Sequence, residues 1–173
     1  TRDIAIRFNH RFGETFVLPK AVTPAEGARV MDLQEPTNKM SKSSNTDAGC
    51  IFLLDDPAAI MKKFKRAVTD SDTEVRYDRE AKPGVSNLLD ILSAATGVKP
   101  VELAEKYTQY GPLKNDTGEA VVEMVKPIQQ RYADLMADRA ELQRLLRKGA
   151  DKARVVASAT LDRARNAIGF LPY

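Results

Sequence analysis

The chain has 173 residues, and 43% of them are hydrophobic, enough to fill the core of one ordinary domain, or of a small domain and part of another. Its 27 basic and 24 acidic residues leave a net charge of +3, so charge gives only a mild preference for polyanionic partners and does not by itself indicate RNA binding. Cys50 is the only cysteine, which excludes an intramolecular disulfide and a cysteine-cluster metal site and fits a reducing cytoplasm. No apolar run approaches the length of a bilayer span, and no signal-peptide pattern opens the chain. We therefore expect a soluble, globular, cytoplasmic protein with no membrane-inserted segment.

The first residues predict an amphipathic helix over residues 2–12 that ends near Gly13. Its apolar positions recur at spacings of three and four: Ile4, Ala5, Phe8 and Phe12. His10, the only histidine, lies in this helix without a cysteine or carboxylate cluster around it. A catalytic histidine needs such partners, so we expect a structural or surface role for His10.

Two short apolar runs, residues 16–18 and 30–33, predict short strands or extended connections at the edge of a sheet. Asp56 followed by Pro57 then predicts the start of a helix. This helix has an apolar stripe and an opposite basic face: Ile60, Phe64, Ala67 and Val68 against Lys62, Lys63, Lys65 and Arg66. The basic face fits either a phosphate-binding surface or, more commonly, an ordinary solvated surface.

The polar stretch from Thr69 to Gly84 predicts a loop that crosses between two packing units. Ser86 is expected to cap a helix that stops at Gly97, and Pro100 to open another. Gly111 and Pro112 are expected to break the pattern again.

The remaining sequence predicts three more helices. The first starts near Asp116 and runs for about five turns, and Pro127 within it predicts a kink near Glu123 to Lys126. A short helix follows from Asp138, and Gly149 separates it from a long final helix. The last two helices carry basic residues that fit either an RNA-backbone surface or a solvated face balanced by acids: Arg147, Lys148, Lys152, Arg154, Arg163 and Arg165.

Residues 39–44, Lys-Met-Ser-Lys-Ser-Ser, form the most informative stretch of the chain. Two lysines three residues apart act as mobile point charges, while hydroxyls and backbone N–H groups add hydrogen bonds to phosphate oxygens. On composition alone, such a stretch also fits an ordinary solvated surface loop.

The order of these residues resembles the KMSKS loop of class I aminoacyl-tRNA synthetases. Further blocks resemble bacterial tryptophanyl-tRNA synthetases, so that the similarity covers essentially the whole chain: residues 27–33, 36–37, 53–57, 67–71, 76–78 and 82–89. The KMSKS loop indicates only the class, whereas the later blocks point to tryptophan rather than tyrosine. A coincidental match in an unrelated helical domain is disfavoured by the length of the similarity.

The resemblance implies a mainly α fold: the end of a Rossmann-like class I catalytic domain, with short strands and the KMSKS loop, followed by an α-helical bundle. Residues 1–68 would form the C-terminal part of the nucleotide-binding domain, residues 69–84 a connecting segment, and residues 85–173 a helical domain of the anticodon-binding type. The family's His-Ile-Gly-His type motif and tryptophan pocket are not in the sequence, which begins with Thr1 rather than methionine. We therefore expect further residues ahead of Thr1 and no activity from this chain alone.

The implied reaction is ATP-dependent activation of tryptophan to the adenylate and its transfer to tRNA(Trp). By the resemblance, Lys39 and Lys42 would be the catalytic residues that hold the triphosphate, with Lys42 most engaged in the transition state. The nucleotide-binding residues would be Val30, Lys39, Met40, Ser41, Lys42 and Ser43.

The resemblance also implies Mg²⁺ accompanying ATP, and a homodimer as the full-length protein. The continuation Ser44-Asn45-Thr46 departs from many relatives, which carry an acidic residue or proline there, and this bears on loop mobility. The alternative is a non-catalytic RNA-binding or regulatory module derived from a synthetase.

Overall fold

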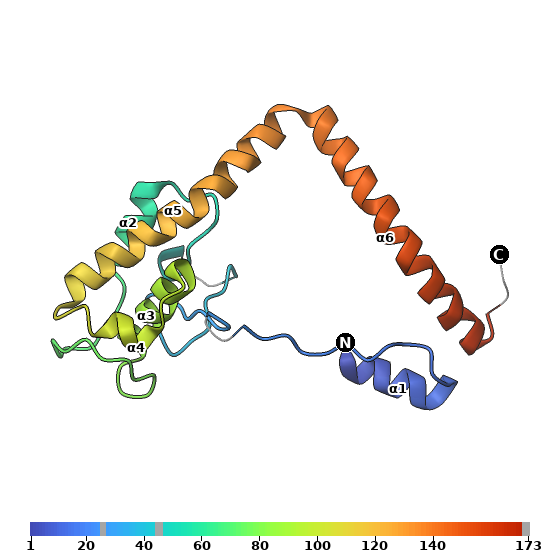
Figure 1. Cartoon of the computed structure of the whole chain (residues 1–173), viewed down its shortest axis with the longest axis horizontal. Coiled ribbons are helices and arrows are strands. Elements are labelled where there is room, and N and C mark those ends of the chain that lie inside the picture. The colour runs from blue at the N-terminus through green and yellow to red at the C-terminus, as the bar shows by residue number, and fades with distance from the viewer. Residues whose placement is uncertain (25–26, 44–46, 171–173) are drawn as a thin grey trace. The chain divides into compact units, whose positions relative to one another are not determined.

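The computed structural model describes residues 1–24, 27–43 and 47–170. The chain divides into two compact units: a core unit, residues Thr23–Ala133, and a terminal unit made of Thr1–Val22 and Asp134–Tyr173. The helices, labelled in Figure 1, are α1 (Arg2–Phe12), the short 3₁₀ helix η1 (Asp47–Gly49), α2 (Pro57–Lys65), α3 (Pro83–Thr96), α4 (Pro100–Ala104), α5 (Tyr110–Ala137) and α6 (Arg139–Ile168).

Helix α3 lies at the centre of the core unit. All its residues from Gly84 to Ser93 are buried, as expected of a helix that is covered on every side. Apolar side chains of the other elements pack with it in one cluster, which includes Leu33, Ile60, Phe64, Leu103, Leu113, Val121 and Val125. Gly118 of α5 allows α2 to approach closely, because a Cβ atom there would lie 2.8 Å from the sulfur of Met61. Side chains anchored in α3 therefore have a rigid support.

Several predicted helix ends are confirmed. Asp56 caps α2 by accepting a hydrogen bond from the N–H of Ala59 at 2.9 Å, and Asp138 caps α6 through Glu141 at 3.0 Å. Helix α3 ends at Gly97, which has a φ of 75°, a conformation that glycine adopts without a steric penalty.

Three other predicted boundaries are wrong. Helix α3 begins at Pro83 rather than Ser86, and the hydroxyl of Ser86 accepts a hydrogen bond from the N–H of Asp78 instead. Residues 111–112 lie in the first turn of α5, where a proline removes no needed donor. Gly149 does not interrupt α6, because a single glycine costs a long helix only about 1 kcal/mol relative to alanine.

The expected end of a Rossmann-like sheet is also wrong. Helices are the regular elements of the described residues, which contain no strand, and residues 30–33 contribute only an isolated antiparallel bridge between Met31 and Lys39. Separate groups take the places that a continuous neighbouring strand would fill. Asn87 bonds to Met31, while Leu33 donates to the carbonyl of Gly49 and accepts from the N–H of Val68. Residues 16–18 form no strand either.

The segment between α2 and α3 has neither helix nor strand, in line with the predicted loop, and it is held by a buried cation. Lys82 is only 3% exposed, and its ammonium group lies 3.1 Å from Asp70 and 3.0 Å from Asp72. Lys82 also donates to the hydroxyl of Tyr110 in α5 at 3.0 Å, and that hydroxyl donates to Asp70. These bonds tie the loop to α5.

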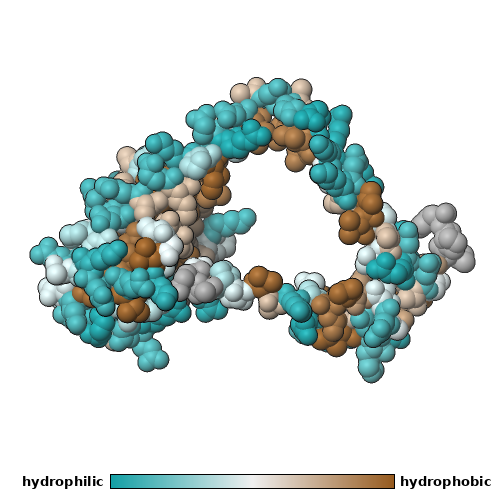
Figure 2. All heavy atoms as spheres, in the orientation of Figure 1, coloured by the Kyte–Doolittle hydropathy of each residue, from teal (hydrophilic) through white to brown (hydrophobic). Residues whose placement is uncertain are grey.

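In the terminal unit, Asn9 of α1 bonds through its side chain to the backbone of Thr15 and Phe16. His10 is exposed, which fits the expected surface role. Figure 2 shows hydrophobic atoms on the surface of α6, whose exposed apolar residues include Leu146, Val155, Val156, Leu161 and Ile168. Within the described part of the chain, no helix has both the length and the apolar character needed to cross a membrane.

Candidate active site

The KMSKS segment, residues 39–43, begins at the bridge between Met31 and Lys39. The N–H of Met40 donates to the carbonyl of Val30 at 3.0 Å, and the N–H of Asp32 donates to the carbonyl of Asn38 at 2.8 Å. The bridge therefore brings Val30, which precedes the KMSKS segment, beside Met40. Val30 and Met40 are both half-buried against the core cluster.

The polar side chains of the segment are exposed. The ammonium groups of Lys39 and Lys42 make no ion pair or hydrogen bond with any residue that the structure describes. The hydroxyls of Ser41 and Ser43 lie 3.0 Å apart, and the N–H of Ser43 donates to Ser41 at 3.3 Å. Two uncompensated cations beside two hydroxyls are suited to binding phosphate oxygens.

A compact turn fixes the start of the segment. Asp32 is buried, and one of its carboxylate oxygens accepts hydrogen bonds from the N–H groups of Gln34 at 2.8 Å and Glu35 at 3.1 Å. Gly49 packs against this carboxylate so closely that a Cβ atom there would lie 1.8 Å from Asp32 Oδ1. The turn therefore depends on a glycine at position 49.

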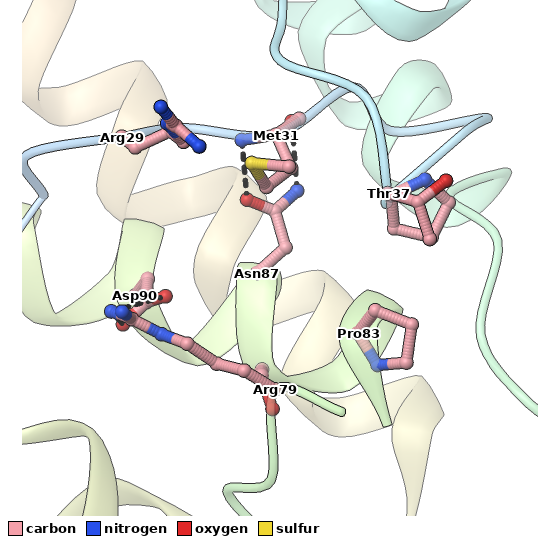
Figure 3. Close-up of a pocket in the computed structure, with 9 residues that line it drawn as sticks. Arg29, Met31, Thr37, Arg79, Pro83, Asn87 and Asp90 are labelled. Carbon is pink, nitrogen blue, oxygen red and sulfur yellow. Dashed lines mark hydrogen bonds and ion pairs between the residues drawn. The ribbon is translucent and has the colours of Figure 1, made fainter. Parts of the chain in front are cut away.

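Asn87 of α3 holds the same region from the other side and was not among the residues predicted from sequence. Its Oδ1 accepts from the N–H of Met31 and its Nδ2 donates to the carbonyl of Met31, both at 2.9 Å (Figure 3). A buried asparagine side chain is expected to have hydrogen-bond partners. That requirement was visible in the sequence, but the identity of the partner was not.

A pocket of about 340 Å³ lies between the 29–37 segment and α3 (Figure 3). It is lined by Arg29, Met31, Pro36, Thr37, Arg79, Pro83, Ser86, Asn87 and Asp90. The carboxylate of Asp90 is buried and accepts from the hydroxyl of Tyr77 at 2.9 Å, while Arg79 pairs with it at 3.1 Å. Burial is the largest cause that raises the pKa of Tyr77, and the hydrogen bond to Asp90 is the second. The hydroxyl therefore remains a donor at neutral pH. None of the six predicted site residues lines this pocket.

The described residues contain no group of three or more histidine, cysteine, aspartate or glutamate side chains arranged to hold a metal ion. The predicted departure at Ser44-Asn45-Thr46 lies outside the described residues.

The chain is similar to known proteins. The sequence model of the family described as tRNA synthetases class I (W and Y) matches residues 1–126. Tryptophan–tRNA ligase 1 of Streptomyces coelicolor is 53% identical over 171 residues, which cover 99% of this chain and 51% of that protein. The chain thus spans about half the length of the curated relatives that it matches.

Two solved structures are also similar. The crystal structure of tryptophanyl-tRNA synthetase from Mycoplasma pneumoniae matches with a TM-score of 0.88 and 31% identity, covering 98% of this chain and 52% of that one. That of the Campylobacter jejuni enzyme, complexed with ADP and tryptophan, has a TM-score of 0.62 and 29% identity over 98% of this chain and 52% of that one. Because the family match covers most of the sequence, including the KMSKS segment, the chain belongs to the class I tRNA synthetases of the tryptophan and tyrosine family.

Proposed function

We propose that this chain is the C-terminal portion of a tryptophan–tRNA ligase and that it supplies the KMSKS loop. The whole enzyme would activate tryptophan with ATP, forming the adenylate and pyrophosphate, and then transfer the aminoacyl group to tRNA(Trp). The names of the similar proteins support tryptophan as the amino acid. The observation that carries the proposal is the pair of exposed lysines, Lys39 and Lys42, without partners among the described residues, on a segment with a fixed start.

The lysines suit the charge that develops in adenylate formation. Attack of the tryptophan carboxylate on the α-phosphate builds negative charge on the phosphate oxygens and on the leaving pyrophosphate. Cations already in place lower the barrier, because they interact more strongly with the transition state than with the ground state. In this proposal Lys39 and Lys42 hold the triphosphate, and Lys42 contributes most in the transition state. Mg²⁺ would arrive with ATP.

The neighbouring residues complete the nucleotide site. Ser41 and Ser43 offer hydroxyls and backbone N–H groups to phosphate oxygens. Val30, half-buried and hydrogen-bonded through its carbonyl to Met40, would contact the adenosine. The ADP in the similar Campylobacter jejuni structure agrees with a nucleotide site in this family. The exposed part of the segment would close over ATP and reopen for product release.

We also propose that residues 1–68 form the C-terminal part of the catalytic domain and that residues 69–84 connect it to a helical domain. This helical domain, residues 85–173, would bind the anticodon region of tRNA(Trp). The basic residues of α6 support an RNA contact, although some of them are paired: Arg154 lies 2.7 Å from Asp151 and Arg144 lies 2.6 Å from Glu141. The full-length protein would act in the cytoplasm as a homodimer.

Amino-acid-dependent exchange of pyrophosphate into ATP tests this proposal. The gene product at its natural length is assayed with tryptophan and tyrosine side by side, and we expect exchange with tryptophan only. Exchange with tyrosine alone would contradict the assigned specificity. Absence of exchange with either amino acid, from a folded protein, would favour the non-catalytic RNA-binding module, which a filter-binding assay with tRNA would then examine.

A further inference from the structure

We propose that Asn87 is a positioning residue for the KMSKS segment: its side-chain amide holds the Met31 peptide groups and thereby places Lys39 and Val30. The catalytic consequence of this inference rests on the proposed function. The contact itself does not, because it involves only the two hydrogen bonds of 2.9 Å between Asn87 and Met31.

The geometry of the bridge leaves Met31 in need of such a partner. The bonds that join the two sides run from Met40 to Val30 and from Asp32 to Asn38, so Met31 faces Lys39 as the non-hydrogen-bonded pair of an antiparallel ladder. The N–H and carbonyl of Met31 therefore point away from Lys39, toward the place of the next strand. The amide of Asn87 presents one donor and one acceptor there and replaces that strand.

Burial of Asn87 fixes the position of its side-chain amide. Asn87 is 3% exposed, and its neighbours Leu88 and Leu89 are fully buried. Removing the amide would leave the N–H and the carbonyl of Met31 without the partner that fixes their position. Since α3 is surrounded by the core cluster, the amide is a fixed reference point for the bridge.

The position of the bridge determines where two predicted site residues lie. Val30 is the residue before Met31, and Lys39 is itself one of the two bridged residues. Loss of the Asn87 contact would let the bridge shift by a fraction of an ångström while the tryptophan pocket, which lies outside these residues in the proposed enzyme, stays in place. The predicted defect is therefore specific to the nucleotide.

The test uses the gene product at its natural length with Asn87→Ala, and Ser93→Ala as the matched control. Ser93 is buried on the same helix, 1% exposed, and its hydroxyl has no partner among the described residues, so its removal disturbs α3 without touching the bridge. We expect Asn87→Ala to lower kcat/KM for ATP in pyrophosphate exchange by about tenfold to a hundredfold, with the KM for tryptophan unchanged, because small misplacements of reacting groups have effects of that size. Ser93→Ala should match the wild type.

Wild-type kinetics for Asn87→Ala would overturn the inference, as would an equal loss for ATP and tryptophan, which indicates a general folding defect. Hydrogen exchange of the unsubstituted protein provides a reading that does not depend on the variant folding. The Met31 amide, which has no backbone acceptor, should exchange as slowly as core amides of α3, and fast exchange would contradict the contact. If the wild type shows no pyrophosphate exchange, the proposed function fails, and the Met31 amide still decides whether Asn87 holds the bridge.

Discussion

Two irregular segments of the core unit use lysine in opposite ways. In the segment between α2 and α3, Lys82 is buried and contacts two carboxylates and a tyrosine hydroxyl. In the KMSKS segment, Lys39 and Lys42 are exposed and have no partner among the described residues. A cation with its carboxylates already in place contributes to the fold, whereas a cation without them remains available to a ligand. Partners, rather than residue type, therefore separate the structural lysine from the candidate catalytic ones.

The electrostatics of Lys82 agree with a structural role. The hydrogen bond to the Tyr110 hydroxyl is the largest cause that raises the pKa of Lys82; burial opposes it, and the bonds to Asp72 and Asp70 add to the increase. The ammonium therefore stays charged throughout the ordinary pH range and cannot act as a proton donor or acceptor at neutral pH.

The largest effect is expected for Lys42, one of the two exposed lysines of the KMSKS segment. Lys42→Ala in the natural-length gene product should lower the rate of tryptophan-dependent pyrophosphate exchange by about a hundredfold to a thousandfold, the range found when a donor that stabilises transition-state charge is removed. The thermal unfolding midpoint should not change, because Lys42 has no partner in the described structure to lose.

Lys65→Ala is the control, since Lys65 is an exposed lysine of α2 that makes no ion pair with any residue that the structure describes. It should leave both the exchange rate and the unfolding midpoint unchanged. A Lys42→Ala enzyme with the wild-type rate of exchange would contradict the catalytic assignment and favour the interpretation of the segment as an ordinary solvated loop.

Substitution of the buried Lys82 should instead change the stability of the protein. Lys82→Ala leaves Asp70 and Asp72 close together without their shared cation, and we expect the midpoint of thermal unfolding to fall by about 10 °C, because removal of one partner of a buried ion pair strongly destabilises a protein. Circular dichroism measures the midpoint, and Lys65→Ala again serves as the control. A midpoint equal to that of the wild type would show that the buried cluster does not stabilise the fold.

The sequence revealed the free lysines more readily than the groups that position them. A run such as Lys-Met-Ser-Lys-Ser is contiguous, so residue order alone identified it, and the Asp56–Pro57 pair likewise fixed a helix start through local chemistry. Asn87 and Met31 are 56 residues apart, and Tyr110 lies 40 residues from Asp70. Neither contact has a local pattern, so neither was predicted.

The same reason explains the error over strands. The apolar pattern of residues 30–33 correctly indicated an extended, partly buried segment, but a sheet also requires a continuous partner. Here one edge of the segment has only the isolated bridge to Lys39, and the partners on the other edge are one side-chain amide and two backbone groups, from Gly49 and Val68. Local periodicity cannot distinguish these partners from a strand.

A third, smaller effect concerns the start of the KMSKS segment. Gly49→Ala should destabilise the protein by about 1–3 kcal/mol, the usual cost of forcing an extra methyl group into a packed site, because the new Cβ atom would overlap Asp32. Gly149→Ala in α6 is the matched control, since a Cβ atom there meets nothing within 4 Å. It should instead stabilise the helix by about 0.5–1 kcal/mol.

Urea unfolding measures both glycine variants. Equal effects of the two substitutions would show that the approach of Gly49 to Asp32 does not constrain the turn. If Gly49→Ala also lowers kcat/KM for ATP in pyrophosphate exchange while the protein remains folded, then the turn, as well as the lysines, contributes to the nucleotide site.

The smallest expected effect is the acid sensitivity of the buried cluster. Burial alone would raise the pKa of Asp70, but the hydrogen bonds from Tyr110 and Lys82 outweigh it and lower this pKa from its ordinary value of 3.8. The folded state then binds fewer protons than the unfolded state, so stability from Asp70 is complete above pH 3.8 and is lost as the pH falls through the lower folded value. Asp70→Asn should reduce the dependence of the urea midpoint on pH between about pH 5 and pH 2. Tyr110→Phe, which removes a bond that lowers the pKa, should act in the same direction. An unchanged slope in both variants would mean that the carboxylate is not selectively stabilised in the folded state, and that Lys82 is held by packing and not by its charge.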